Sequence, residues 1–316
     1  TMKISLLLQR EPFSEIVEKT LTNFFRNYYG TTHNITWHNR GHDVNDSCKQ
    51  VWLCNAYLNA FFVSSVDKDV LLPIIREFSR STKKWRAPLQ KLYVWLATSR
   101  FTNDKLATAT LEMSPPLKNA EQMLIIGGNH HIRILDYHRN CCFVIGKSGF
   151  NVEFMEEEIR VRQENPSLPS PSIIQIADDG SWYSEELILG TPLNRLADQR
   201  QAAKAVHKVS CALFQLYQNT EERISSDDYA GCLAEKIERL AVANHLLAAE
   251  ERIKLLLDVA ILRSLAAYQS ETITVQSHGD FQPANILLGE GKTWLIDWEY
   301  TARRQICYDG LVYGLA

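Results

Sequence analysis

Three oxygen-bearing side chains near the end of the chain have the types and the spacing to perform chemistry. Asp280 precedes Asn285 by five residues, and Asp297 follows after an apolar run and a glycine-containing turn. One carboxylate can accept or orient the proton of an attacking hydroxyl group, while an amide and another carboxylate can hold Mg²⁺ against phosphate groups. Phosphoryl transfer from ATP requires this set of groups.

The residues around these side chains predict a β-hairpin that would bring them together. Residues 286–288 (ILL) and 294–296 (WLI) are apolar, and residues 289–293 join them as a four-to-five-residue loop. Asn285 would then enter the first strand and Asp297 would leave the second, at the same end of the hairpin. The alternative is a purely structural hairpin in which Asp280 and Asn285 only cap turns. The neighbouring residues His278-Gly279 and Ile-Asp-Trp-Glu favour a site over that alternative.

The motifs HGDFQPAN (278–285) and IDWE (296–299) resemble those of the aminoglycoside phosphotransferase and choline kinase families. These families share the protein-kinase-like fold and phosphorylate small hydroxyl compounds. The resemblance implies that Asp280 is the catalytic base, that His278 orients the catalytic loop, and that Asn285 and Asp297 hold Mg²⁺. It also implies that Asp309 starts a helix and braces the loop. HGD in place of HRD, and IDWE in place of DFG, disfavour a protein kinase.

Residues 116–190 predict a small antiparallel-sheet lobe that would bind the nucleotide. The turn at Gly127-Gly128 would let backbone N–H groups approach phosphates, because glycine has no side chain to hold them away. Lys147 ends the third strand of this lobe, where the resemblance places the lysine that contacts the α- and β-phosphates. Arg133 is the competing cation, but its alternation with isoleucines favours an exposed strand position.

A predicted helix after Lys147 contains three consecutive glutamates, Glu156, Glu157 and Glu158. The resemblance requires one of them to pair with Lys147, and the interval to Pro171 favours Glu158. Glu157 remains the alternative, and Arg162 could pair with Glu158 on the helix surface instead.

Two further segments complete the predicted nucleotide lobe and open the next one. Glu186 and Ile188 belong to a predicted hinge whose backbone groups would bind the adenine edge. Residues 190–193 (GTPL) resemble the opening of the large lobe in these families. Amphipathic patterns then predict helices at residues 193–217, 229–246 and 249–268. The resemblance leads us to expect more helices beyond Ala316.

The motifs do not explain residues 1–115. A strand at residues 2–8, a helix at residues 12–29 and a strand at residues 33–39 suggest an α/β segment, followed by helical residues 68–99. The aromatic and aliphatic content is too high for a disordered leader. We expect the segment either to shape the acceptor site or to mediate self-association.

Composition excludes several classes of protein. A net charge of −3 over 316 residues disfavours a nucleic-acid-binding protein, which would usually be basic. No apolar run approaches the roughly 18 residues of a membrane span, and the amino terminus lacks a signal-peptide pattern. The seven cysteines are scattered and include no CxxC pair. They predict reduced core thiols in a cytoplasmic protein, neither a zinc site nor a set of disulfides.

These observations predict an α+β, bilobal protein-kinase-like fold with an extra α/β segment at the N-terminus. The expected parts are the N-terminal segment 1–115, the nucleotide lobe 116–190 and the helical large lobe 191–316. The expected activity is an ATP- and Mg²⁺-dependent phosphotransferase. Its acceptor would be a hydroxyl group of an aminoglycoside, a choline-like amine or a sugar. The alternative is a kinase-like scaffold that binds partners through residues 1–115.

Overall fold

The computed structural model describes residues 3–39, 49–80, 85–243, 249–266, 270–289 and 291–316. The chain divides into two compact units. The first unit consists of residues 1–159 and 171–189, and the second of residues 160–170 and 190–316. Both units combine helices with antiparallel strands, which confirms the predicted α+β class.

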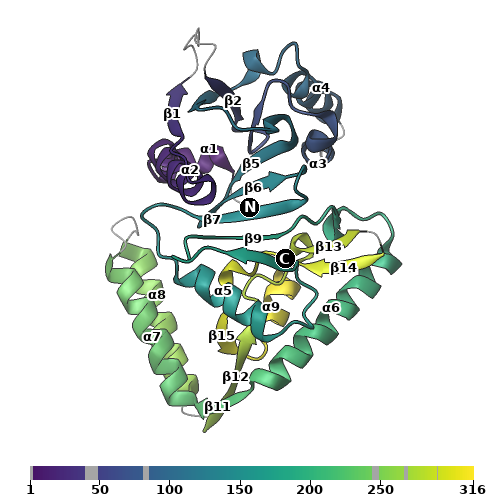
Figure 1. Ribbon diagram of the computed structural model, residues 1–316. Coiled ribbons are helices and arrows are strands. Elements are labelled where there is room, and N and C mark those ends of the chain that lie inside the picture. The colour runs from purple at the N-terminus through teal and green to yellow at the C-terminus, as the bar shows by residue number, and fades with distance from the viewer. Residues whose placement is uncertain (1–2, 40–48, 81–84, 244–248, 267–269, 290) are drawn as a thin grey trace. The chain divides into compact units, whose positions relative to one another are not determined.

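A single antiparallel sheet organises the first unit (Figure 1). Within the described residues it has nine strands in the order β1-β4-β2-β3-β5-β6-β7-β9-β8. The strands are β1 (Asn34–Asn39), β2 (Gln50–Asn55), β3 (Ala60–Val63), β4 (Ala109–Ser114), β5 (Met123–Gly127), β6 (His131–Asp136), β7 (Cys141–Gly146), β8 (Ile173–Ile176) and β9 (Trp182–Glu186). The helices are α1 (Ile4–Arg10), α2 (Phe13–Tyr29), α3 (Lys68–Phe78), α4 (Ala87–Thr98) and α5 (Glu153–Glu164), with short 3₁₀ turns at Asp104–Leu106 and Ala120–Gln122. The division between the units falls within α5, after residue 159.

The sheet continues without a break from the N-terminal segment into the predicted nucleotide lobe. Strand β3 pairs with β5 through Ala60 opposite Ile126 and Phe61 opposite Ile125. Residue 115, the predicted boundary, therefore lies between two strands of the same sheet, β4 and β5. One hydrophobic core also extends from α1 and α2 to β7 and β9.

The predicted strand at residues 2–8 is wrong, because this segment forms the helix α1. Ile4 and Leu7 are fully buried while Leu6 and Leu8 are exposed. Burial at a spacing of three residues fits one face of a helix, whereas a half-buried strand would bury every second residue. An all-apolar run as short as this one does not by itself distinguish the two.

The strands predicted between residues 123 and 186 are confirmed, and α5 forms where a helix was predicted. Strand β7 shows how the two faces of the sheet are used. Phe143 and Ile145 belong to the core shared with α2, whereas Cys142 and Val144 pack with residues of α5 and β9. Successive side chains of a strand point to opposite faces, so α2 and α5 cover opposite sides of the sheet.

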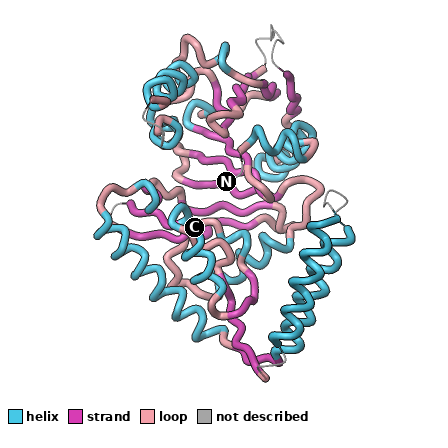
Figure 2. Tube along the Cα trace, turned by 180° about the vertical axis from the view of Figure 1, so that it is seen from behind, coloured by secondary structure: helices cyan, strands magenta, loops and turns pink. Residues whose placement is uncertain are grey.

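Helices dominate the second unit, with two small antiparallel sheets among them (Figure 2). The helices are α6 (Gln199–Thr220), α7 (Ser226–Ala243), α8 (Ala249–Ala266) and α9 (Tyr308–Leu315), with 3₁₀ turns at Leu193–Arg195, Pro283–Asn285 and Trp298–Tyr300. One described sheet joins β10 (Thr191–Pro192), β13 (Ile286–Gly289) and β14 (Lys292–Leu295). The other joins β11 (Glu222–Ser225), β12 (Glu271–Ser277) and β15 (Ala302–Gln305).

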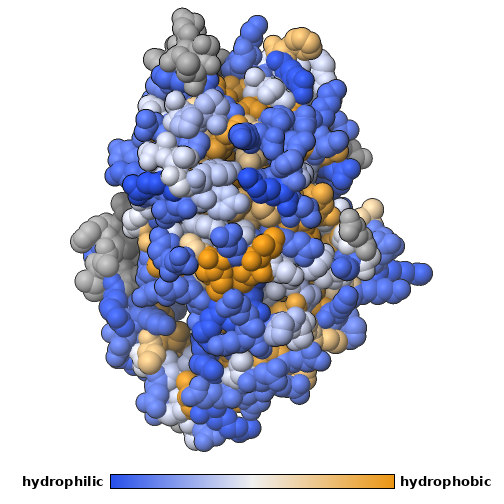
Figure 3. All heavy atoms as spheres, in the orientation of Figure 1, coloured by the Kyte–Doolittle hydropathy of each residue, from blue (hydrophilic) through white to orange (hydrophobic). Residues whose placement is uncertain are grey.

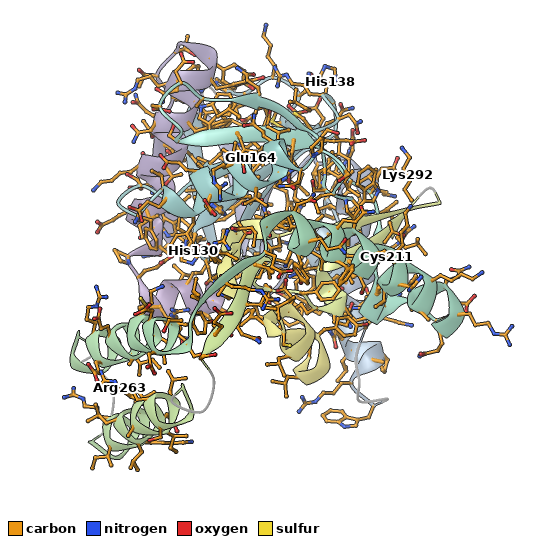
Figure 4. All side chains as sticks on the ribbon, turned by 90° about the horizontal axis from the view of Figure 1, so that it is seen from below. His130, His138, Glu164, Cys211, Arg263 and Lys292 are labelled. Carbon is orange, nitrogen blue, oxygen red and sulfur yellow. The ribbon has the colours of Figure 1, made fainter. Side chains whose placement is uncertain are left out.

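The first helix of this unit begins six residues later than the predicted start at residue 193. The side chain of Asp198 accepts hydrogen bonds from the backbone N–H groups of Arg200 and Gln201 at 2.8 and 3.3 Å. An aspartate at this position satisfies donors that have no partner within the helix, and it therefore sets the start of α6. Helices α7 and α8 lie side by side, and Arg263 of α8, labelled in Figure 4, donates to Glu238 of α7 at 3.1 Å.

Hydrophobic and hydrophilic residues both reach the surface, as the mixed colours in Figure 3 show. Within the described residues, no helix combines the length and the apolar character needed to cross a bilayer. The described cysteines are free thiols, of which Cys54, Cys141 and Cys142 are buried. Cys211, Cys232 and Cys307 are exposed, so the prediction of core thiols is wrong for these three.

Candidate active site

The predicted hairpin forms, and it positions two of the three oxygen-bearing side chains. Ile286 pairs with Leu295, and the ladder continues to Gly289 and Lys292, so the connection is shorter than predicted. The backbone N–H of Ile296 donates to the carbonyl of Asn285 at 2.9 Å. Asn285 and Asp297 therefore lie at the same end of the hairpin, as the sequence predicted.

Asp280 is held directly by its neighbours in the loop before β13. Asn285 Nδ2 donates to Asp280 Oδ2 at 2.8 Å and to the Asp280 carbonyl at 2.9 Å. Gln282 Nε2 lies 2.9 and 2.8 Å from the two carboxylate oxygens of Asp280. These contacts fix the direction of the carboxylate before any substrate arrives, which is what a general base requires.

Asp309 braces the loop from the first turn of α9, as the resemblance implied. Its Oδ2 accepts the backbone N–H of His278 at 2.7 Å, and its Oδ1 accepts that of Gly279 at 2.9 Å. The hydroxyl of Tyr217 on α6 also donates to Oδ2 at 2.7 Å. Asp309 is buried, and its two oxygens connect α6, α9 and the loop.

His278 lies fully buried at the centre of this network. Its Nδ1 accepts the backbone N–H of Asp280 at 3.2 Å, so its Nε2 carries the proton and donates to the carbonyl of Ile296 at 3.1 Å. Its ring also packs edge-on against Trp298, with 4.6 Å between the ring centroids. The imidazole therefore connects the backbone on both sides of the site and holds Asp280 beside the residue that precedes Asp297.

Burial lowers the pKa of His278, although the nearby carboxylates of Asp309, Asp297 and Asp280 oppose that effect. In the folded protein the ring stays neutral below its ordinary pKa of 6.5, whereas in the unfolded chain it becomes protonated. The unfolded chain then binds more protons, so this residue lowers the free energy of unfolding as the pH falls below that value.

We expect His278→Gln to remove this part of the pH dependence. The free energy of unfolding should be measured by urea titration at several pH values from above 7 down to about 5.5. The difference between wild type and variant should shrink as the pH falls, with a slope of at most about 1.4 kcal/mol per pH unit. A difference that stays constant over this range would contradict the assignment of a buried neutral histidine.

Gly279 permits the closest backbone approach in the site. Its φ is +89°, and a Cβ added there would lie 2.0 Å from the carbonyl oxygen of Tyr300. No side chain can be accommodated against a backbone atom at that distance. Glycine is therefore required for the loop to pass beside residues 297–300.

Asp297 has a left-handed backbone conformation, with φ of +69° and ψ of +54°. This conformation is unfavourable for residues other than glycine, and it occurs more often at functional sites than elsewhere. Trp298 follows it, is fully buried, and donates from its indole nitrogen to the carbonyl of Leu295 at 3.0 Å. The anchored tryptophan and the left-handed residue together set the direction in which the Asp297 carboxylate leaves the hairpin.

The donor set at this end of the hairpin fits a magnesium ion. Because Nδ2 of Asn285 makes both contacts with Asp280, the amide oxygen is the group left for a cation. Mg²⁺ usually takes only one or two protein carboxylates and completes its octahedron with water and phosphate oxygens. Among the residues that the structure describes, no three His, Cys, Asp or Glu side chains cluster as a self-sufficient metal site. The Asn285 amide and the Asp297 carboxylate would therefore hold Mg²⁺ only together with phosphate oxygens and water.

The predicted phosphate-binding lysine lies in the first unit, directly after β7. The backbone N–H of Lys147 donates to the carbonyl of His130, which is labelled in Figure 4 and follows the glycine turn. The Lys147 side chain is fully buried, and its Nζ lies 2.5 Å from Oε1 of Glu11. Lys147 is therefore adjacent to the β5–β6 turn, and one of its partners is a carboxylate from the N-terminal segment.

The predicted pair of Lys147 with Glu158 stays a prediction. Glu158 is buried on α5, and its Oε1 accepts a hydrogen bond from the hydroxyl of Tyr183 on β9 at 2.9 Å. Tyr183 lies in the same row of the sheet as Val144, which faces α5. Lys147 follows Ile145 by two residues, and Ile145 faces α2.

The remaining predicted nucleotide contacts are also in the first unit. Gly127 ends β5, where an added Cβ would lie 3.1 Å from the ring of Phe13, so its lack of a side chain lets α2 pack closely. Gly128 lies in the turn that follows. Glu186 ends β9, and Ile188 lies just before the boundary between the two units at residues 189 and 190. Their contacts with a nucleotide remain predictions.

Sequence reasoning missed two residues of this arrangement. Gln282 holds both oxygens of Asp280, and its place two residues after Asp280 was a signal that could have been used. Glu11 contacts Lys147 from 136 residues away along the chain. No local pattern marks Glu11, because its partner becomes its neighbour only through the fold.

Comparison with known protein families and with curated proteins finds no match. Comparison with solved structures finds similar chains, all of low sequence identity. A choline/ethanolamine kinase family protein from Mesorhizobium loti is 15% identical, with a TM-score of 0.43 over 72% of this chain and 70% of that one. The choline kinase LicA from Streptococcus pneumoniae is 14% identical, with a TM-score of 0.42 over 63% of this chain and 67% of that one.

A third similar structure is the ADP-bound aminoglycoside phosphotransferase APH(2'')-Ib, which is 14% identical. Its TM-score is 0.43 over 58% of this chain and 67% of that one. A glucosamine kinase is also similar, and the chain spans 53% of its length. In this comparison the chain is similar to structures described as choline kinases, a glucosamine kinase and an aminoglycoside phosphotransferase, and likenesses of this size carry no conclusion about its family or activity.

Proposed function

We propose that this protein is an ATP- and Mg²⁺-dependent phosphotransferase that moves the γ-phosphate to a hydroxyl group of a small molecule. The observation that carries the proposal is the network around Asp280. A carboxylate is fixed by Asn285 and Gln282, and its loop is tied to His278 and Asp309. A structural turn does not require a buried histidine and a buried aspartate to hold one half-exposed carboxylate in place.

The proposed roles follow from the chemistry of each group. Asp280 accepts the proton of the acceptor hydroxyl, because its carboxylate is oriented and half-exposed. Asn285 and Asp297 hold Mg²⁺, which when bound neutralises charge on the β- and γ-phosphates. Lys147 binds phosphate oxygens beside the β5–β6 turn. His278 keeps the loop and the hairpin end together and takes no proton in the reaction.

The acceptor is proposed from the motif resemblance alone: an aminoglycoside, a choline-like amine or a sugar. A cytoplasmic location and self-association through residues 1–115 remain predictions as well. The first experiment is a thermal-shift series with ATP and ADP, with and without Mg²⁺. Stabilisation that requires both nucleotide and Mg²⁺ supports the proposal. If no nucleotide stabilises the protein at any concentration, the scaffold function is favoured instead.

The second experiment identifies the acceptor. Purified protein with Mg-ATP is incubated with a panel of aminoglycosides, choline, ethanolamine and amino sugars, and ADP release is followed above the acceptor-free rate. Mass spectrometry should then show a product heavier than the acceptor by one phosphoryl group. ADP release without any phosphorylated product would count against transfer to a hydroxyl group.

A pair of variants should separate nucleotide binding from chemistry. Lys147→Ala should weaken Mg-ATP binding and slow transfer, because the ammonium group would interact with phosphate in both the ground state and the transition state. Asp280→Asn should leave ATP affinity almost unchanged and lower turnover by about a hundredfold or more, because the base acts in the transition state. Calorimetry and steady-state kinetics measure the two effects, and Lys118→Ala, on an exposed lysine of the first unit, is the control. Equal losses of ATP affinity in both variants would contradict these roles.

A further inference from the structure

The contact between Lys147 and Glu11 connects the N-terminal segment to the proposed nucleotide site. The two side chains are 2.5 Å apart, and the lysine side chain is fully buried. Its Nζ also lies 5.3 Å from the ring centre of Phe13 and 5.2 Å from that of Phe150. A buried ammonium group needs a counter-charge, and aromatic faces add a weaker attraction. Glu11 supplies one such charge.

Glu11 is held rigidly enough to orient its partner. It follows α1, and its backbone N–H donates to the carbonyl of Leu7 at 3.1 Å, while its own carbonyl accepts from Phe13 at 2.7 Å. Helix α1 is itself anchored, because the N–H of Ile4 donates to Oδ1 of Asn59 at 2.7 Å. Ile4 and Leu7 are buried in the core of the first unit. The carboxylate therefore extends from a fixed position on the scaffold.

The N-terminal helices also hold the backbone next to Lys147. The N–H of Ser148 donates to the hydroxyl of Thr20 on α2 at 2.9 Å. A Cβ on Gly127 would lie 3.1 to 3.3 Å from side-chain atoms of Phe13, Ile4 and Leu7, so α1 and α2 pack tightly against the end of β5. Both the strand that precedes the glycine turn and the segment that carries the lysine thus contact α2.

We propose that Glu11 is a positioning residue for Lys147 and directs its ammonium group to the nucleotide phosphates. The inference rests on the proposed phosphotransferase function. An ammonium group has three N–H donors, so a bond to Glu11 leaves the group able to bind phosphate as well. The N-terminal segment therefore contributes a residue to the nucleotide site rather than only covering the sheet.

The test compares single variants and a double variant by calorimetric titration with Mg-ADP. Glu11→Gln keeps the size of the side chain and removes its charge. It should weaken Mg-ADP binding by about tenfold, a typical coupling between residues in contact. Glu11→Asp, which retains the charge, should recover part of this loss. The matched control is Glu15→Gln, which makes the same charge change at an exposed position in the first turn of α2 and should bind like wild type.

The double variant distinguishes positioning from a general loss of structure. If Glu11 acts through Lys147, adding Glu11→Gln to Lys147→Ala should produce no further loss of Mg-ADP affinity. The inference is overturned if Glu11→Gln binds like wild type, or if its effect persists undiminished without the lysine. Wild-type protein that binds no Mg-nucleotide would overturn the proposed function itself. Normal wild-type binding with an unaffected Glu11→Gln variant would overturn this inference alone.

Discussion

Asp297→Ala is expected to lower turnover by at least about a thousandfold while the protein stays folded. Under the proposed function, Asp297 would hold the Mg²⁺ that neutralises the charge between the β- and γ-phosphates, so removing its carboxylate should remove that stabilisation. The Asp297 side chain is half-exposed at the end of the hairpin, so its loss creates no cavity in the core. Turnover is measured as ADP release with the identified acceptor, and folding by thermal unfolding.

The left-handed backbone at Asp297 requires a second variant. Alanine is less tolerant of a φ of +69° than aspartate or asparagine, so part of the effect of Asp297→Ala could come from strain. Asp297→Asn keeps the shape and the tolerance for this conformation and removes only the charge. Asp228→Ala, which removes an exposed carboxylate elsewhere in the second unit, is the control. Near-wild-type turnover in Asp297→Asn would exclude the charged carboxylate from the mechanism.

Gly279→Ala is expected to have the largest effect on stability. The added Cβ would lie 2.0 Å from the carbonyl oxygen and 2.6 Å from the carbonyl carbon of Tyr300. Backbone atoms cannot move aside cheaply, so the loop or residues 297–300 must shift. The backbone strain at a φ of +89° adds to this steric cost. We expect a loss of about 3 kcal/mol or more in the free energy of unfolding, together with loss of turnover.

Gly291→Ala provides the matched control for this prediction. Gly291 also has a positive φ, +75°, but no atom lies within 4 Å of an added Cβ. Its replacement should cost only the backbone strain, about 1 kcal/mol. Denaturant unfolding of both variants separates the steric contribution from the conformational one. Equal losses in the two variants would show that the close approach of Gly279 to Tyr300 does not matter.

The loop of residues 278–285 and the hairpin that follows it could be predicted from the sequence because their contacts are local. Asn285 contacts Asp280 five residues earlier, and β13 pairs with β14 up to Gly289 opposite Lys292. The apolar runs and the glycine turn determine these pairings without help from the rest of the chain. The strands of the predicted nucleotide lobe were recognisable for the same reason. Each has alternating or continuous apolar residues, and turn residues lie between them.

Only the tertiary structure decided how the N-terminal segment is used. Residues 2–8 contain a run of apolar residues that suits a strand or a helix equally, and burial of Ile4 and Leu7 on one side selected the helix. The pairing of Phe61 with Ile125 joins the segment to the nucleotide-lobe strands. Strand pairing of this kind depends on which sheet edges and faces are still exposed after the local elements have formed. No local sequence pattern contains that information.

Ion pairs between residues that are far apart in the sequence could not be predicted for the same reason. Lys147 was identified from its place at the end of a strand, but the carboxylate beside it comes from the link between α1 and α2. The direction of the Lys147 side chain depends on the pleat and twist of the strand that it follows. The three consecutive glutamates on α5 therefore could not show from the sequence which carboxylate contacts the lysine. The sequence by itself determined the candidate reactive groups and their local order. The packing of α1 and α2 on the sheet brought Glu11 to Lys147, because a buried charge takes a counter-charge that the fold brings to it.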